Sequence, residues 1–189
     1  TSSQLRRSIC RASGKLSPTK YKRREMASYY QSIGIHVTSE NLLVTTGGSE
    51  ALIFGLMTTC NPGDEVIIPE PFYANYNGFG TQAGISVIPV RSYIETGFAL
   101  PFFSEIEKMI SNKTKAIMIC NPNNPTGTLI PKNELKAFLS KIPQHIIVVL
   151  DEAYDEYLDT EDKSISFSWL QEFPNLIISR TFSKAYGLA

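Results

Sequence analysis

The sequence is poor in the residues that build disulfide frameworks and metal sites. It has three cysteines, Cys10, Cys60 and Cys120, which is an odd number, and they lie far apart without a CxxC pair. The two histidines, His36 and His145, share no metal-like spacing with them. Disulfide-rich secreted domains need even numbers of closely spaced cysteines. We therefore expect no metal site, and we interpret Cys60 and Cys120, which lie in apolar segments, as reduced core residues of a cytoplasmic protein.

Long apolar runs and an excess of charge of either sign are also absent. No stretch approaches the length of a membrane span or resembles the core of a signal peptide, so we predict no membrane segment. The 18 basic and 18 acidic residues give a net charge of zero. A hydrophobic content of 42% in 189 residues is typical of a globular protein and argues against disorder.

The basic residues are nevertheless concentrated at the start of the chain, where residues 1–24 contain no acid. A nucleic-acid arm or a transit leader would have this composition, but a solvated approach segment is the commoner explanation. We therefore expect no nucleic-acid partner. We divide the chain into an N-terminal approach segment with a helix, residues 1–38, and one large domain, residues 39–189.

Short apolar segments alternate along the chain with segments of helical spacing. The predicted strands are residues 42–44, 66–68, 85–90, 115–120, 146–150 and 175–178. The predicted helices are residues 26–33, 53–60, 73–80, 106–110 and 131–142. Continuous apolar runs indicate strands buried on both faces, hence a mainly parallel sheet between helix layers. We predict an α/β fold, a three-layer α/β/α sandwich.

Glycine- and proline-rich motifs follow the first two strands, at the sheet edge where open α/β sheets bind ligands. Residues Thr46–Glu50 (TGGSE) open a helix, and their glycines and unpaired N–H groups can form a phosphate cradle. A tight turn with an N-cap explains the same residues equally well. Residues Pro69–Tyr73 (PEPFY) offer an aromatic ring for stacking on a ligand or for core packing.

Three later strand ends carry an amide, a carboxylate and a lysine. Residues Asn121–Gly127 (NPNNPTG) form a stiff loop with three asparagines. Asp151 ends an apolar strand, where a carboxylate is unfavourable unless a positive charge pairs with it, and either a cationic cofactor ring or a structural arginine would serve. Lys184 lies in Ser179–Leu188 (SRTFSKAYGL), where an ordinary loop lysine is the simpler explanation for that stretch alone.

Together these groups match one flat, phosphorylated, cationic heteroaromatic aldehyde. Pyridoxal 5′-phosphate (PLP) binds a lysine as a Schiff base, places an aspartate at its pyridinium nitrogen, and places its phosphate at a helix N-terminus. The five motifs supply each of these groups at a strand end. We therefore predict that the chain binds PLP.

The same motifs are similar to those of the class I/II aminotransferases, which are PLP enzymes of fold type I. The resemblance covers nearly all of the chain from about Met26 onward. It rests on residues 45–52 (TTGGSEAL), 61–73 (NPGDEVIIPEPFY), 121–127 (NPNNPTG), 151–154 (DEAY) and 179–189 (SRTFSKAYGLA). Residues up to about 120 are most similar to aspartate aminotransferases, and residues 129–189 to histidinol-phosphate aminotransferases.

The resemblance implies a role for each matched residue. Lys184 binds PLP and, once the substrate releases it, moves a proton between the substrate and the cofactor. Asp151 pairs with the ring nitrogen, Asn124 and Tyr154 contact the ring 3′-oxygen, and Tyr73 stacks on the ring. The groups implied to hold the phosphate are the backbone N–H groups of Gly48, Ser49 and Glu50 and the hydroxyls of Thr181 and Ser183.

The resemblance also implies parts that these 189 residues do not contain. The family has a phosphate-binding arginine shortly after the lysine, and a small C-terminal domain with an arginine for the substrate carboxylate. Residues 13–22 lack the family's tyrosine-containing pattern in recognisable form, so the sequence does not identify Tyr21 as the tyrosine that reaches the partner subunit's site. We expect a longer, homodimeric parent, and little or no transamination by residues 1–189 alone.

The predicted function is PLP-dependent transamination between an amino acid and a 2-oxo acid, of the aspartate type by the first half of the chain. One alternative is a histidinol-phosphate aminotransferase of histidine biosynthesis. Others are C–S lysis or decarboxylation on the same fold, an inactive fragment, and the aminotransferase-like effector module of a regulator. No helix-turn-helix pattern precedes the domain within this sequence, which argues against the regulator.

Overall fold

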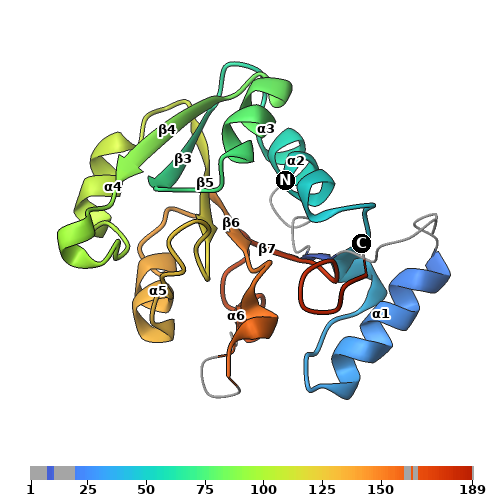
Figure 1. The fold of residues 1–189 in the computed structure, drawn as a ribbon. Coiled ribbons are helices and arrows are strands. Elements are labelled where there is room, and N and C mark those ends of the chain that lie inside the picture. The colour runs from blue at the N-terminus through green and yellow to red at the C-terminus, as the bar shows by residue number, and fades with distance from the viewer. Residues whose placement is uncertain (1–7, 11–19, 160–162, 164–165, 189) are drawn as a thin grey trace.

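Seven strands form one sheet in the part of the chain that the computed structural model describes, residues 8–10, 20–159, 163 and 166–188. The strand order is β2-β1-β7-β6-β5-β3-β4, and every neighbouring pair is parallel (Figure 1). The strands are β1 (Ser8–Cys10), β2 (Leu42–Leu43), β3 (Glu65–Glu70), β4 (Ser86–Arg91), β5 (Thr114–Cys120), β6 (Ile147–Asp151) and β7 (Leu176–Arg180).

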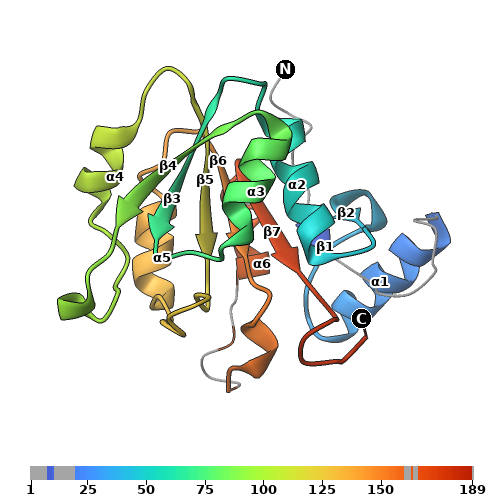
Figure 2. The same cartoon turned by 45° about the horizontal axis from the view of Figure 1, so that its top comes forward.

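Helices cover both faces of the sheet (Figures 1 and 2). On one face lie α2 (Gly48–Thr59) and α3 (Asn75–Ala83). On the other lie α1 (Lys20–Ser32), α4 (Phe103–Met109), α5 (Lys132–Leu139) and α6 (Ser166–Trp169). Short 3-10 turns are η1 (Ser39–Asn41), η2 (Ile94–Thr96) and η3 (Asp155–Tyr157). The predicted three-layer sandwich with a parallel sheet is confirmed, and within the described residues no helix is long and apolar enough to cross a membrane.

Successive residues of the central strands divide the core into two clusters. In β5, Ile117 and Ile119 pack in the cluster that contains α4, α5 and α6, whereas Met118 packs with α2 and α3. In β6, Val148 and Val149 separate in the same way. All five side chains are at most 2% exposed. The strands are therefore buried on both faces, which is why they read as continuous apolar runs rather than alternating ones.

The sequence pattern located α2 but misplaced part of its buried face. Apolar residues at i, i+3, i+4 and i+7 from Ile53 predict a buried stripe that includes Met57, but Met57 is 59% exposed. Leu56 is buried as predicted, but the rest of the buried face is formed by Ala51, Leu52 and Gly55. Small residues let a helix approach the sheet closely, so this face packs better than one that carries the flexible methionine.

Two elements were not predicted from the sequence. Residues Ser8–Cys10 form β1 between β2 and β7, inside the segment that the composition assigned to a solvated approach. The single-turn helix α6 is the other. Both are too short to show a periodic pattern, so tertiary pairing and packing determine them. Residues 1–7 and 11–19 of the basic segment lie outside the described residues, as does the Tyr21 side chain.

Gly80 in α3 occupies a position where a side chain does not fit. A Cβ there would lie 2.8 Å from Val87 Cγ2 and 3.2 Å from the carbonyl oxygen of Ile85. Gly80→Ala should therefore lower the free energy of unfolding by about 1–3 kcal/mol, measured by urea denaturation. Gly78→Ala in the same helix is the matched control, because a Cβ added at Gly78 would have no atom of a neighbouring residue within 4 Å. It should leave stability unchanged or raise it by up to about 1 kcal/mol, and equal losses in both variants would contradict the packing argument.

Candidate active site

A pocket of about 160 Å³ lies at the carboxyl ends of β5, β6 and β7, beside the N-terminus of α2. The register pairs Cys120 with Asp151 and Asp151 with Ser179, so the last residues of three strands are direct neighbours at one edge. Nine of the ten predicted site residues line this pocket: Gly48, Ser49, Tyr73, Asn124, Asp151, Tyr154, Thr181, Ser183 and Lys184. Its lining also includes Gly47, Leu52, Cys120, Ala153 and Ser179, which are not among the ten.

Glu50 is the predicted site residue that does not line the pocket. Its carboxylate accepts hydrogen bonds from the backbone N–H and the hydroxyl of Thr46. The Glu50 side chain therefore caps the N-terminus of α2 and does not face the pocket. The role predicted for Glu50 involves only its backbone N–H. That group belongs to the first turn of α2, whose N–H groups have no partner within the helix.

The N-terminus of α2 faces the hydroxyl groups that follow β7. A Cβ at Gly48 would lie in van der Waals contact with Thr181 Cβ, at 3.7 Å, so the start of the helix and the loop lie close together here. In that loop, Thr181 Oγ1 and Ser183 Oγ are 2.7 Å apart. Helix N–H groups and hydroxyls at the positive end of a helix form a site suited to an anion such as phosphate.

Asp151 is buried at the floor of the pocket, with 6% of its surface exposed. Its Oδ2 accepts a hydrogen bond of 2.6 Å from the Tyr76 hydroxyl, and its Oδ1 accepts one of 3.2 Å from the Ala153 N–H. Burial raises the pKa of Asp151 to about 6, although the two hydrogen bonds act against this change. No ion pair joins Asp151 to an arginine among the described residues.

Lys184 and Asn124, from the asparagine loop, also line the pocket. Lys184 Nζ lies 5.6 Å from the centre of the Tyr154 ring, a cation–π distance. Asn124 Nδ2 donates a hydrogen bond of 3.0 Å to the Tyr154 hydroxyl, so these two predicted ligands of one cofactor oxygen lie together. Asn123 Nδ2 donates to the carbonyl oxygen of Pro71 at 3.1 Å, which attaches the loop to the end of β3.

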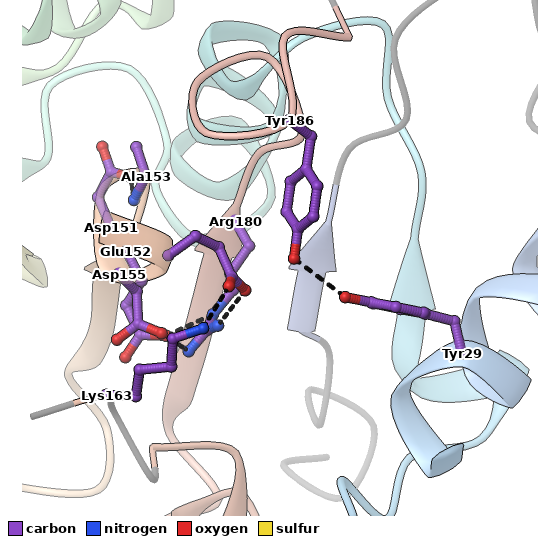
Figure 3. A network of polar contacts seen from close by, with 9 residues as sticks. Tyr29, Asp151, Glu152, Ala153, Asp155, Lys163, Arg180 and Tyr186 are labelled. Atoms are coloured by element: carbon purple, nitrogen blue, oxygen red, sulfur yellow. Dashed lines mark hydrogen bonds and ion pairs between the residues drawn. The ribbon is translucent and has the colours of Figure 1, made fainter. Parts of the chain in front are cut away.

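A buried arginine joins β7 to the segment after β6 (Figure 3). The Nη2 atom of Arg180 lies 2.7 Å from Glu152 Oε2 and 2.8 Å from Asp155 Oδ2. Its guanidinium also lies 4.7 Å from the centre of the Phe167 ring. Burial opposes the charge of Arg180, but the two carboxylates outweigh it and raise the pKa of the guanidinium. A structural arginine was one of the two partners that the sequence suggested for Asp151. Arg180 is such an arginine, but it pairs with Glu152 and Asp155 instead.

The loop that carries Lys184 is also attached to α1. The hydroxyls of Tyr186 and Tyr29 are 3.1 Å apart (Figure 3). Phe182 packs against both rings, with centroids 5.2 Å from Tyr186 and 6.1 Å from Tyr29. The residues on either side of Lys184 are therefore held by aromatic contacts to a helix far away in sequence.

Tyr76 is a buried polar residue beneath the site that the sequence did not reveal. It follows Tyr73 by three positions in a helix whose apolar pattern is weak, and it does not line the pocket itself. The available signal was its residue type, because a buried tyrosine usually needs a partner for its hydroxyl. The sequence alone does not show that the partner is Asp151, 75 positions away.

Residues 14–189 match the family model described as aminotransferase class I and II. The chain belongs to this family. Its members are PLP-dependent transferases, and the predicted family is confirmed. The chain is 42% identical over 153 residues to histidinol-phosphate aminotransferase 1 of Idiomarina loihiensis, an alignment that covers 81% of this chain and 41% of that protein.

Solved structures of aminotransferases share the fold. The aspartate aminotransferase from Thermus thermophilus with maleate superposes with a TM-score of 0.71 at 33% identity, over 81% of this chain and 41% of that one. The aromatic aminotransferase from Pyrococcus horikoshii OT3 superposes with a TM-score of 0.78 at 26% identity, over 92% and 48%. The chain thus spans less than half the length of each of these relatives.

The buried ion pairs of Arg180 with Glu152 and Asp155 should contribute much more to the free energy of unfolding than an exposed ion pair does. Arg180→Met leaves the buried Glu152 and Asp155 without their cation, so it should lower the free energy of unfolding by about 3–5 kcal/mol. Lys136→Met is the matched control, because its pair with Glu172 has side chains 44% and 51% exposed. Its effect should be about 0–1 kcal/mol. Chemical denaturation of both variants measures the difference, and a tolerated Arg180→Met would contradict this account of the cluster.

Proposed function

We propose that residues 39–189 are the cofactor-binding part of a PLP-dependent aminotransferase. One observation carries this proposal: Lys184, Asp151 and the N-terminus of α2 line a single pocket. They occur at the positions of the family's motifs, in a chain whose residues 14–189 match the family model. The boundary between the N-terminal segment, residues 1–38, and this cofactor-binding part is also proposed.

The residues of the pocket fit PLP in their chemistry. Gly48, Ser49, Thr181 and Ser183 line the pocket together, and a phosphate there would be held by the first N–H groups of α2 and by these hydroxyls. Asp151 is a buried carboxylate with only neutral hydrogen-bond donors, so a cationic ring nitrogen would supply its missing counter-charge. Tyr73, Asn124 and Tyr154 would orient the ring between these two ends.

The chemistry divides between the cofactor and the chain. Bound PLP supplies an electron sink for the negative charge that develops when the substrate loses its α-proton. Asp151 would hold the ring-nitrogen proton that makes this sink effective. Lys184 would hold the cofactor and, once released, would carry the proton from the substrate α-carbon. Asn124 and Tyr154, joined by a hydrogen bond, would orient the ring.

For the substrate, we propose that the full-length parent is of the histidinol-phosphate type, moving an amino group between histidinol phosphate and a 2-oxo acid. The relative with 42% identity over 153 residues supports this alternative better than the aspartate-type prediction. The structural similarity to an aspartate and to an aromatic aminotransferase supports the common fold and does not separate the substrates.

We further propose that the parent acts as a cytoplasmic homodimer, and the buried free thiols of Cys60 and Cys120 are consistent with a reducing compartment.

Borohydride trapping tests the cofactor site directly. Addition of PLP below one equivalent, followed by reduction and peptide mass spectrometry, should place the pyridoxyl group mainly on Lys184. Lys184→Ala should abolish this labelling. Lys136→Ala is the control, because Lys136 forms an exposed ion pair outside the pocket and should leave the yield unchanged. Labelling spread evenly over surface lysines, in wild type and Lys184→Ala alike, would refute the proposed site.

Amino-donor assays of the full-length protein test the substrate. With 2-oxoglutarate as acceptor, histidinol phosphate should give a kcat/KM at least about tenfold above that of aspartate, within the range by which binding pockets discriminate. The reverse preference would favour the aspartate-type prediction. Residues 1–189 alone should show little turnover with either donor, since they span about two fifths of the related enzyme.

A further inference from the structure

The hydrogen bond between Tyr76 and Asp151 is the shortest polar contact of the pocket floor. The Tyr76 hydroxyl donates to Asp151 Oδ2 at 2.6 Å, and the two residues are 1% and 6% exposed. The bond joins α3 to the end of β6 across 75 positions of sequence. A short bond to a carboxylate inside the protein is stronger than the same bond at the surface.

The Tyr76 ring is packed against other aromatic rings on several sides. Its centroid lies 6.1 Å from that of Phe72 in a stacked arrangement and 6.2 Å from that of Phe79. It meets the Tyr73 ring edge-on, at 5.6 Å and 89°. Since Tyr73 is the proposed stacking residue, Tyr76 contacts both a ring that would cover the cofactor and the carboxylate that would meet its nitrogen.

The other titratable groups near Asp151 do not replace this bond. Cys120 on β5 is a neutral thiol, because burial raises its pKa to about 12. Glu152, next along the chain, destabilises the Asp151 charge, and Lys184 beyond β7 stabilises it only weakly. Arg180 is paired with Glu152 and Asp155 on the other side of the strand. The donors that support the ionised Asp151 are therefore Tyr76 and the Ala153 N–H.

We infer that Tyr76 is a positioning residue, which holds the Asp151 carboxylate ionised and aimed into the pocket before any cofactor binds. A neutral hydroxyl that donates to a carboxylate favours its charged form. Loss of the hydroxyl therefore makes the proton on Asp151 harder to remove. The consequence for a bound ring nitrogen rests on the proposed function, whereas the effect on Asp151 itself does not.

The test is a carboxyl titration of the cofactor-free protein. With ¹³C-labelled aspartate and Asp151→Asn to assign the signal, NMR should show the Asp151 midpoint about 1 pH unit higher in Tyr76→Phe than in wild type, the change expected for one lost bond to a charged acceptor. Tyr93→Phe is the matched control, because its side chain is 52% exposed and lies outside the pocket lining. It should leave the midpoint unchanged.

A second variant keeps the test valid if Tyr76→Phe folds poorly. Difluorotyrosine at position 76 retains the ring and makes the hydroxyl a stronger donor, so the Asp151 midpoint should move downward. An unchanged midpoint in both variants would overturn the inference.

PLP affinity separates this inference from the proposed function. At pH 7, Tyr76→Phe should weaken PLP binding about twofold, since a rise of the Asp151 pKa from about 6 by about one unit lowers the ionised fraction from about nine tenths to about half. A shifted midpoint with no PLP binding in any variant would leave the role of Tyr76 intact and refute the cofactor assignment.

Discussion

The candidate site depends on the parallel register of β5, β6 and β7. Because these strands run in the same direction and end at one edge, Cys120, Asp151 and Ser179 are neighbours although they are far apart in sequence. The loops that leave this edge carry Asn124, Tyr154 and Lys184 into the same pocket. A change of register by one residue would turn Asp151 to the opposite face of the sheet, so the strand pairing itself determines the chemistry of the pocket.

The alternation of side chains along a strand also explains why two adjacent buried acids differ. Asp151 points to the side of α2 and α3, where it meets the hydroxyl of Tyr76. Glu152 follows it and meets Arg180, whose guanidinium packs on Phe167 of α6. One carboxylate is neutralised by a fixed cation, and the other has only neutral donors and a raised pKa. That imbalance leaves Asp151 suited to a cationic ligand, while Arg180 holds β7 and its lysine loop in place.

The motifs that identify the family describe its cofactor more than its substrate. The cradle, the amide, the carboxylate and the lysine line the pocket that we propose for PLP, the cofactor of this family. Similarity in these motifs therefore does not separate one substrate from another. The proposed substrate rests instead on the 42% identity over 153 residues to a histidinol-phosphate aminotransferase.

The sequence by itself determined the α/β class and the parallel sheet, because apolar runs and polar strand ends are local patterns, and its resemblance to a family identified nine of the pocket-lining residues. It did not locate β1, whose three residues have no apolar pattern and are held by pairing with β2 and β7. Nor did it show the face of α2, which depends on how closely Ala51 and Gly55 approach the sheet. The partners of Asp151 and Arg180 were decided by tertiary structure alone, since a hydrogen bond across 75 residues exists only once the helix and the strand have packed together.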